Sequence, residues 1–199
     1  RWYHRFADAQ GLLERIIRDH PDYYPPYVTL AYIRFLQYRF PEAAQLALTV
    51  VRLNKNEADV STYVRAHLIY AGAKGMIAHF GGPMSRLLNG FIVLPTLQEA
   101  QNMKPDSPEV LYALGSYYLL RPRGLGKNLR LAKEYLERLV VKEPLFPDGF
   151  ARLAQVYKVK GDYQKYEELL AAALQLDPNS EVALDIKNNT CGFICPDSD

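Results

Sequence analysis

The sequence predicts an all-α protein that is built from repeated helical hairpins. Apolar residues recur at three- and four-residue steps along most of the 199 residues, which is the spacing of one face of an α-helix. One order of apolar, small and aromatic residues returns four times in a single register, and prolines stand at most of the joints. Hydrophobic residues make up 49% of the chain, which is typical of a folded domain and excludes a disordered one.

The clearest unit is residues 147–178, PDGFARLAQVYKVKGDYQKYEELLAAALQLDP. Its first predicted helix carries an aromatic residue, a leucine, a small residue and a tyrosine on one face, namely Phe150, Leu153, Ala154 and Tyr157. Gly161 predicts the turn, because glycine adopts a positive φ without strain. Leu170 and Ala173 predict a second helix, which Pro178 closes.

Three upstream units share this register. Their first helices are marked by Tyr27, Leu30, Ala31 and Arg34, then by Tyr63, Ala66, His67 and Tyr70, and then by Leu111, Leu114, Gly115 and Tyr118. Residues 1–23 look like the second helix of a further unit, with Ala9, Leu13, Ile16 and Pro21 in the expected places. We therefore predict a half-repeat at 1–23, repeats near 24–59, 60–107, 108–146 and 147–180, and a tail at 189–199.

This order of residues resembles the tetratricopeptide repeat (TPR) family. The resemblance implies a single helical repeat domain over 1–188 with about nine to eleven helices. It also implies that the hairpins stack into a curved right-handed superhelix, in which the first helix of each pair lines the inner groove.

The unit near 60–107 carries an insertion at 75–95 that a plain TPR hairpin has no room for. Its apolar residues recur at three-, four- and seven-residue steps: Met76, Ile77, Phe80, Met84, Leu87, Leu88, Phe91 and Ile92. That spacing predicts two helical pieces broken at Gly81-Gly82-Pro83. We expect the segment to lengthen the first helix and to form a wall or lid beside the groove, or to pack against an oligomer partner.

The stretch RPRGLGKNLR at 121–130 has the glycines and the lysine of a phosphate-binding loop. Such a loop follows a β-strand, whereas the residues before it have helical periodicity, and Asn128 stands where a hydroxyl residue belongs. We predict an exposed turn in which Asn128 caps the next helix. The basic residues could still contact an anion at that helix end, and they are Arg121, Arg123, Lys127 and Arg130.

Residues 111–140, LYALGSYYLLRPRGLGKNLRLAKEYLERLV, together with the unit that follows, resemble the T-component of TRAP transporter systems. The resemblance covers about 110–178 and extends more loosely from 60. It implies a periplasmic, often lipid-anchored protein that partners a substrate-binding protein and has a hydrophobic central pore or groove. A cytoplasmic location is the alternative, and the sequence leaves open whether a signal or lipid anchor was removed.

The predicted inner positions are mostly apolar and aromatic, so they favour a hydrophobic ligand or an amphipathic partner helix. They are Val28, Tyr32, Phe35, Val64, Leu68, Tyr112, Ser116 and Gln155. The alternative is that the insertion or the tail folds back and buries them.

The sequence predicts no catalytic residue, cofactor or metal ligand. The four histidines do not cluster, and Cys191 and Cys195 form either a disulfide or two free thiols. With 24 basic and 22 acidic residues, the chain lacks the charge of a nucleic-acid-binding protein. No apolar run reaches the length of a transmembrane helix.

The leading hypothesis is therefore a non-catalytic binding scaffold with a protein partner, possible homo-oligomerisation and possible binding of a hydrophobic small molecule. The TRAP T-component role is its specific form. One alternative is a general TPR adaptor that recognises a peptide or helix. The other is a small-ligand carrier or an enzyme built in the groove.

Overall fold

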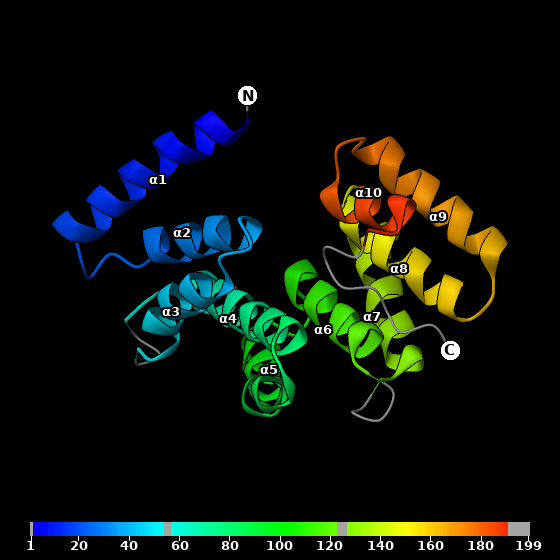
Figure 1. The fold of residues 1–199 in the computed structure, drawn as a ribbon, viewed down its shortest axis with the longest axis horizontal. Coiled ribbons are helices and arrows are strands. Elements are labelled where there is room, and N and C mark those ends of the chain that lie inside the picture. The colour runs from blue at the N-terminus through cyan, green and yellow to red at the C-terminus, as the bar shows by residue number, and fades with distance from the viewer. Residues whose placement is uncertain (1, 54–56, 123–126, 191–199) are drawn as a thin grey trace. The chain divides into compact units, whose positions relative to one another are not determined.

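The computed structural model describes residues 2–53, 57–122 and 127–190, with side chains described from residue 8 onward (Figure 1). Ten α-helices run through these ranges, and none of the described residues belongs to a β-strand. The helices are α1 (Trp2–Asp19), α2 (Pro25–Leu36), α3 (Phe40–Val51), α4 (Val60–Phe80), α5 (Pro83–Met103), α6 (Pro108–Leu120), α7 (Leu129–Lys142), α8 (Pro147–Val159), α9 (Tyr163–Leu176) and α10 (Glu181–Asn188). The all-α fold of repeated helical hairpins that the sequence predicts is confirmed.

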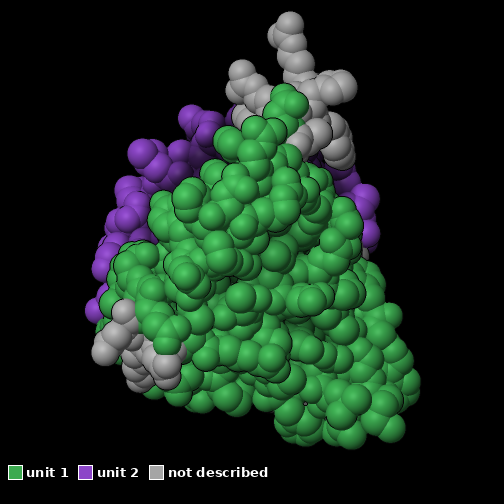
Figure 2. Space-filling view, turned by 90° about the vertical axis from the view of Figure 1, so that its left-hand side faces the viewer, with its two compact units in different colours: residues 1–105 green, residues 106–199 purple. Residues whose placement is uncertain are grey.

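Each predicted repeat contains one pair of consecutive helices. The pairs are α2 with α3, α4 with α5, α6 with α7, and α8 with α9, while α10 packs on both helices of the last pair. The chain divides into two compact units, residues 1–105 and 106–199, which Figure 2 shows in separate colours. The boundary falls between the second and the third full repeat. A single domain and a superhelix across that boundary stay predictions.

Helix starts are set by prolines and by capping side chains, which explains why the predicted joints are rich in both. Pro25, Pro83 and Pro108 stand in the first turn of α2, α5 and α6, where their missing N–H is not needed. Asp59 caps α4 by accepting a hydrogen bond from the Thr62 N–H at 3.0 Å. The hydrogen bonds from the hydroxyl and N–H of Thr62 lower the pKa of the Asp59 carboxyl below its ordinary value.

The first unit is held together by small residues where helices cross. Helix α1 packs on α2, α2 packs on α3 and α4, and α4 packs on α5. Alanines at the crossings are fully buried and let the backbones approach closely; they are Ala31, Ala43, Ala47, Ala66, Ala71 and Ala73. Val28 and Val50 pack with Ala66 in one buried cluster.

The second unit has a larger core of leucines. Leu111, Leu136 and Leu139 from α6 and α7 form one buried cluster with residues of α8, α9 and α10. Gly115 of α6 faces α7 so closely that a Cβ atom there would lie 2.5 Å from Leu136 Cγ. No real Cβ contact is that short, so the position requires glycine.

The turn predicted at 121–130 is shorter than expected: α6 ends at Leu120 and α7 already begins at Leu129, so Leu129 and Arg130 belong to α7. The segment before the turn is a helix, as its periodicity predicts. The Asn128 side chain accepts a hydrogen bond from the Leu131 N–H at 3.0 Å, which confirms it as the cap of α7. Residues 123–126 lie outside the described part of the chain.

After α10, Asn189 takes the left-handed conformation that often ends a helix. The predicted tail therefore begins where the last helix ends. Cys191 and Cys195 lie outside the described residues, and their pairing stays a prediction.

We expect Gly115→Leu to lower the free energy of unfolding by about 2–3 kcal/mol, because Leu136 is fully buried and has no room to move away. Gly115→Ala should destabilise in the same direction. The matched control is Gly90→Ala in α5, where an added Cβ meets nothing within 4 Å and should stabilise the helix by about 0.5–1 kcal/mol. Urea unfolding followed by circular dichroism measures all three. Equal stabilities of wild type and Gly115→Leu would contradict the assigned repeat register.

Candidate interaction surface

The insertion lengthens both helices of the second hairpin. Helices α4 and α5 each have 21 residues, whereas the other paired helices have 12 to 14. The break falls at Gly81 and Gly82, so the prediction of two helical pieces is confirmed. The Ser85 hydroxyl donates to the Ile77 carbonyl at 2.9 Å, and thereby fixes the start of α5 against the end of α4.

Four large apolar side chains in the first half of α5 face solvent. They are Met84, Leu87, Leu88 and Phe91, which are 67%, 52%, 62% and 65% exposed, and we call them the α5 stripe. Their i, i+3, i+4, i+7 spacing places them on one face of the helix. The opposite face of α5 is buried through Val93, Leu97 and Ala100.

The described residues do not cover the α5 stripe. The sequence correctly places apolar residues on one face, whereas their burial beside the groove or against an oligomer partner stays a prediction. Within the described chain the hairpin buries other residues of the insertion, such as Met76. The physical reason is that α4 and α5 pack on each other through the faces that carry Gly75, Val93 and Leu97, which leaves the stripe on the outside.

Aromatic rings gather at the end of α4, next to the turn that leads to the stripe. Phe80 is exposed and stacks on Phe40 with 6.1 Å between ring centroids, and Phe40 also meets Phe35 at 5.3 Å and Tyr38 at 5.8 Å. Tyr38 has a positive φ of 59°, and the Arg39 N–H bonds to the Arg34 carbonyl, which ends α2 and turns the chain into α3. This turn places Phe40 beside Phe80.

The structure separates the predicted groove residues into buried and accessible ones. Val28, Val64 and Gln155 are only 1%, 3% and 3% exposed, so they pack inside their units and offer no contact surface. Tyr32 is exposed, and Phe35, Leu68, Tyr112 and Ser116 are half-buried. The hydroxyl oxygen of Ser116 is nevertheless buried. Four of the eight positions therefore present accessible side chains, and their role in partner binding stays a prediction.

The buried positions have identifiable contacts. Val28 packs in the cluster with Val50 and Ala66, which sequence periodicity on one helix does not reveal. Gln155 accepts a hydrogen bond from the guanidinium of the buried Arg152 at 2.7 Å. Nearby, the Ser180 hydroxyl donates to Asp148 at 2.7 Å, and burial raises the pKa of the Asp148 carboxyl.

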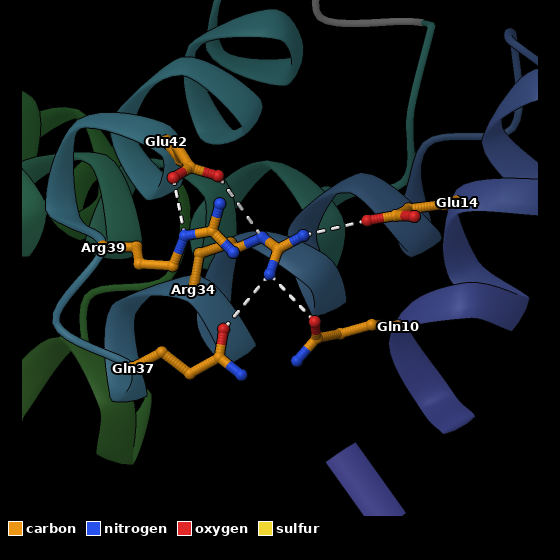
Figure 3. Close-up of polar contacts among 6 residues, drawn as sticks. All are labelled: Gln10, Glu14, Arg34, Gln37, Arg39 and Glu42. Atoms are coloured by element: carbon orange, nitrogen blue, oxygen red, sulfur yellow. Dashed lines mark hydrogen bonds and ion pairs between the residues drawn. The ribbon is translucent and has the colours of Figure 1, made fainter. Parts of the chain in front are cut away.

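A polar cluster around Arg34 joins α1, α2 and α3 (Figure 3). The Arg34 guanidinium donates to Glu14 at 2.8 Å, to Gln10 at 2.9 Å and to Gln37 at 3.2 Å, and it lies 3.6 Å from Glu42. Arg34 itself is buried. A buried guanidinium is stable only when its donors are satisfied, and here two carboxylates and two amides satisfy it.

The contact between Arg34 and Glu14 of the preceding helix has a counterpart in the second unit, made by different residue types. Tyr157 donates to Glu137 of the preceding helix at 3.2 Å, and the two residues are 20 positions apart, as are Arg34 and Glu14. Helix α1 therefore contacts α2 at the same separation in sequence as α7 contacts α8, and the half-repeat at 1–23 stays a prediction. The sequence analysis did not predict this cluster. It could have been suspected from Arg34, because the other three repeats have tyrosine at the equivalent position.

The four basic residues of the predicted anion contact have separate surroundings. Arg121 lies over the Tyr117 ring at 5.0 Å, and burial lowers the pKa of its guanidinium. Arg130 lies 3.9 Å from Glu134 on the surface of α7. Lys127 is half-buried and Arg123 lies outside the described residues. Anion binding stays a prediction.

Two shallow hollows occur in the first unit. One of ≈ 330 Å³ lies among α3, α4 and α5, beside Tyr70, Lys74 and Ile77, and the other of ≈ 310 Å³ lies beside Arg34. Within the described ranges, no three His, Cys, Asp or Glu side chains come close enough to hold a metal ion. Among the described helices, none combines the length and the apolar character that crossing a membrane requires.

Comparison with solved structures shows the fold. A thermophilic TPR protein of Thermus thermophilus matches with a TM-score of 0.74 and 20% identity, over 94% of this chain and 89% of that one. MamA matches with a TM-score of 0.55 and 18% identity, over 89% and 92%. The C-terminal part of a TPR protein from Cytophaga hutchinsonii matches with a TM-score of 0.51 and 16% identity, over 94% and 69%. The chain thus has a TPR-like helical repeat fold.

No family model and no curated protein matches the chain. The resemblance to TRAP T-components therefore stays a prediction.

We expect Arg34→Ala to lower the free energy of unfolding by about 1–2 kcal/mol and to speed hydrogen exchange in α1. The loss stays below that of a fully buried pair, because the Glu14 and Glu42 side chains are 44% and 46% exposed and water can solvate them. Arg39→Ala is the control: Arg39 also bonds to Glu42, but it is exposed, so its removal should change stability by less than about 0.5 kcal/mol. Similar exchange rates in α1 of the two variants would argue against a role of the Arg34 cluster in holding α1.

Proposed function

We propose that the protein is a non-catalytic scaffold that binds a protein partner, and that the α5 stripe with Phe80 is a principal contact surface. One observation carries the proposal: four large apolar side chains at helical spacing are each more than half exposed. Single exposed apolar residues are common on protein surfaces, whereas a contiguous row of them marks an interaction site.

The energetics of burial support this reading. Fully burying one exposed large apolar side chain contributes about 1.5–3 kcal/mol, and the stripe residues, which are 52–67% exposed, can each contribute about half to two thirds of that. Four such side chains and Phe80 would therefore offset a substantial part of the cost of association. The length of the hairpin also supports it, since the insertion adds surface that the repeat itself does not need for its core.

A TPR-like fold suits a scaffold, because stacked hairpins present extended surfaces that bind other chains. The Ser180 hydroxyl, which donates to the Asp148 carboxylate, also accepts the Ala183 N–H and so caps α10. His67 is buried and its Nδ1 lies 2.8 Å from the Tyr63 carbonyl. The two hollows are at the lower limit of the volume that holds small organic ligands, so a carrier function has weaker support than protein binding.

The more specific hypothesis is that the partner is the substrate-binding protein of a TRAP system and that it binds in the inner groove. The accessible positions Tyr32, Phe35 and Leu68 in the first unit would contribute apolar contacts to such a groove. This hypothesis predicts a different contact region from the α5 stripe, so one experiment separates the two.

We expect a photo-crosslinking amino acid at position 88 to capture a discrete protein in the source cells. The same amino acid at position 32 tests the groove. Position 141 is the control, because Val141 is an exposed apolar residue of α7 outside both surfaces. Crosslinks from position 32 alone would favour the groove, and no protein crosslink from either position would contradict the scaffold function.

A further inference from the structure

We infer that the face of α2 and α3 beneath α1 is a second binding surface, which accepts a partner helix with a carboxylate and an amide one turn apart. Helix α1 occupies this face as a built-in ligand that the partner displaces. The inference goes beyond the proposed function, because this surface is separate from the α5 stripe. Three observations carry it, namely the shallow burial of α1, its polar attachment to Arg34 and the hollow beneath it.

Helix α1 is only shallowly buried. None of its described side chains, from residue 8 onward, is buried, whereas every other described helix has buried side chains. The predicted register places Leu13 and Ile16 of α1 where α7 has Leu136 and Leu139. The α7 pair is fully buried, but the α1 pair is half-buried because, among the described helices, α1 packs on α2 alone. A helix with so few buried apolar contacts opens at a lower free-energy cost than the core of its domain.

The attachment of α1 defines the polar chemistry of the partner (Figure 3). The Arg34 guanidinium donates to Glu14 at 2.8 Å and to Gln10 at 2.9 Å, and these two acceptors lie four residues apart on one face of α1. A buried guanidinium is costly to leave unsatisfied, so a helix that replaces α1 has to supply acceptors at the same two places. The partner helix should therefore carry Gln or Asn four residues before Glu or Asp.

The hollow beneath α1 defines the apolar chemistry of the partner. It has a volume of ≈ 310 Å³ and lies beside Arg34, where Leu30 of α2, Leu46 of α3 and Glu14 of α1 line it. Leu30 is buried and Leu46 is half-buried, so α1 leaves apolar surface of α3 accessible. A partner helix with a large apolar side chain beside its carboxylate can fill this hollow, and it then buries more apolar area than α1 does.

A second copy of the chain fits this surface less well than a helix of another protein. The α1 of a second copy would make the same contacts and leave the same hollow, so it gains nothing over the chain's own α1. The chain's own α1 is tethered to the face through residues 20–24, which gives it a high effective concentration there. A different helix that fills the hollow has the additional contact needed to displace it.

The test uses a fluorescein-labelled peptide with the sequence of residues 2–19, in which Gly11→Ala raises the helical propensity. An added Cβ at Gly11 meets nothing within 4 Å, so the change leaves the contact with α2 intact. A second peptide also carries Glu14→Lys. Fluorescence anisotropy measures binding of both peptides to the full chain and to its variants Glu14→Gln, Arg34→Met and Glu134→Gln. The last is the matched control, because Glu134 makes a surface ion pair on α7.

We expect Glu14→Gln in the chain to tighten binding of the first peptide by about threefold or more, because it weakens the hold of α1 and leaves the face beneath it intact. Arg34→Met should weaken binding about tenfold, and the Glu14→Lys peptide should bind about tenfold less tightly than the first. Glu134→Gln should leave binding within about twofold of wild type. Adding the first peptide should speed hydrogen exchange in α1, and circular dichroism checks that the variants fold.

Equal affinities of wild type and Glu14→Gln would overturn the inference, as would the lack of any binding or binding that leaves hydrogen exchange in α1 unchanged. Peptide binding that is lost in Leu88→Glu would place the peptide on the α5 stripe instead. Sedimentation that shows a dimer of the full chain, lost in Arg34→Met, would assign the face to a second copy and overturn the choice of another protein. Crosslinking from position 88 tests the proposed function separately, so either proposal can fail while the other stands.

Discussion

The fold depends on close contact between helices at small residues. Each hairpin crosses its neighbours at positions where alanine or glycine is buried, such as Ala31 in α2, Ala66 in α4 and Gly115 in α6. Larger side chains at these points would separate the backbones and open the cores on both sides. Three repeats carry this residue at the same place, as Ala31, Gly115 and Ala154, whereas the second has the buried His67 there and Ala66 one position before it. Within each unit the helices therefore pack closely at equivalent points, and the remaining positions are free to vary.

Arg34 is an example of such variation at a position outside the helix crossings. Where the other repeats have tyrosine, it contacts the preceding helix through ion pairs and amides instead of a ring. The contact with Glu14 has the same separation in sequence as that between Tyr157 and Glu137, so the geometry of the repeat is kept while its chemistry changes. Polar contacts of this kind are weaker than packed apolar ones when their carboxylates are accessible to water. Helix α1 is therefore attached partly by interactions that depend on solvent.

Much of the fold could be predicted from the sequence because helical periodicity and capping are local properties. The break at Gly81-Gly82, the cap at Asn128 and the small slot at Gly115 follow from a few neighbouring residues. The surfaces could be predicted only in part. Periodicity assigns Val28 to a helical face, but its burial depends on α3 and α4, which are distant in sequence.

The position of the insertion explains how the hairpin gains a surface without disturbing the repeat. Pro95 lies inside α5, where the added half meets the half that carries Leu97 and Ala100 of the repeat pattern. Proline has no N–H, so the Phe91 carbonyl loses its helical partner at this junction, and Pro95 is exposed where water can replace it. Both halves of α5 pack on α4, but Leu97 and Ala100 in the second half are buried, whereas the added half leaves the α5 stripe exposed. A solvent-facing apolar row can persist in the added half because no core contact depends on it.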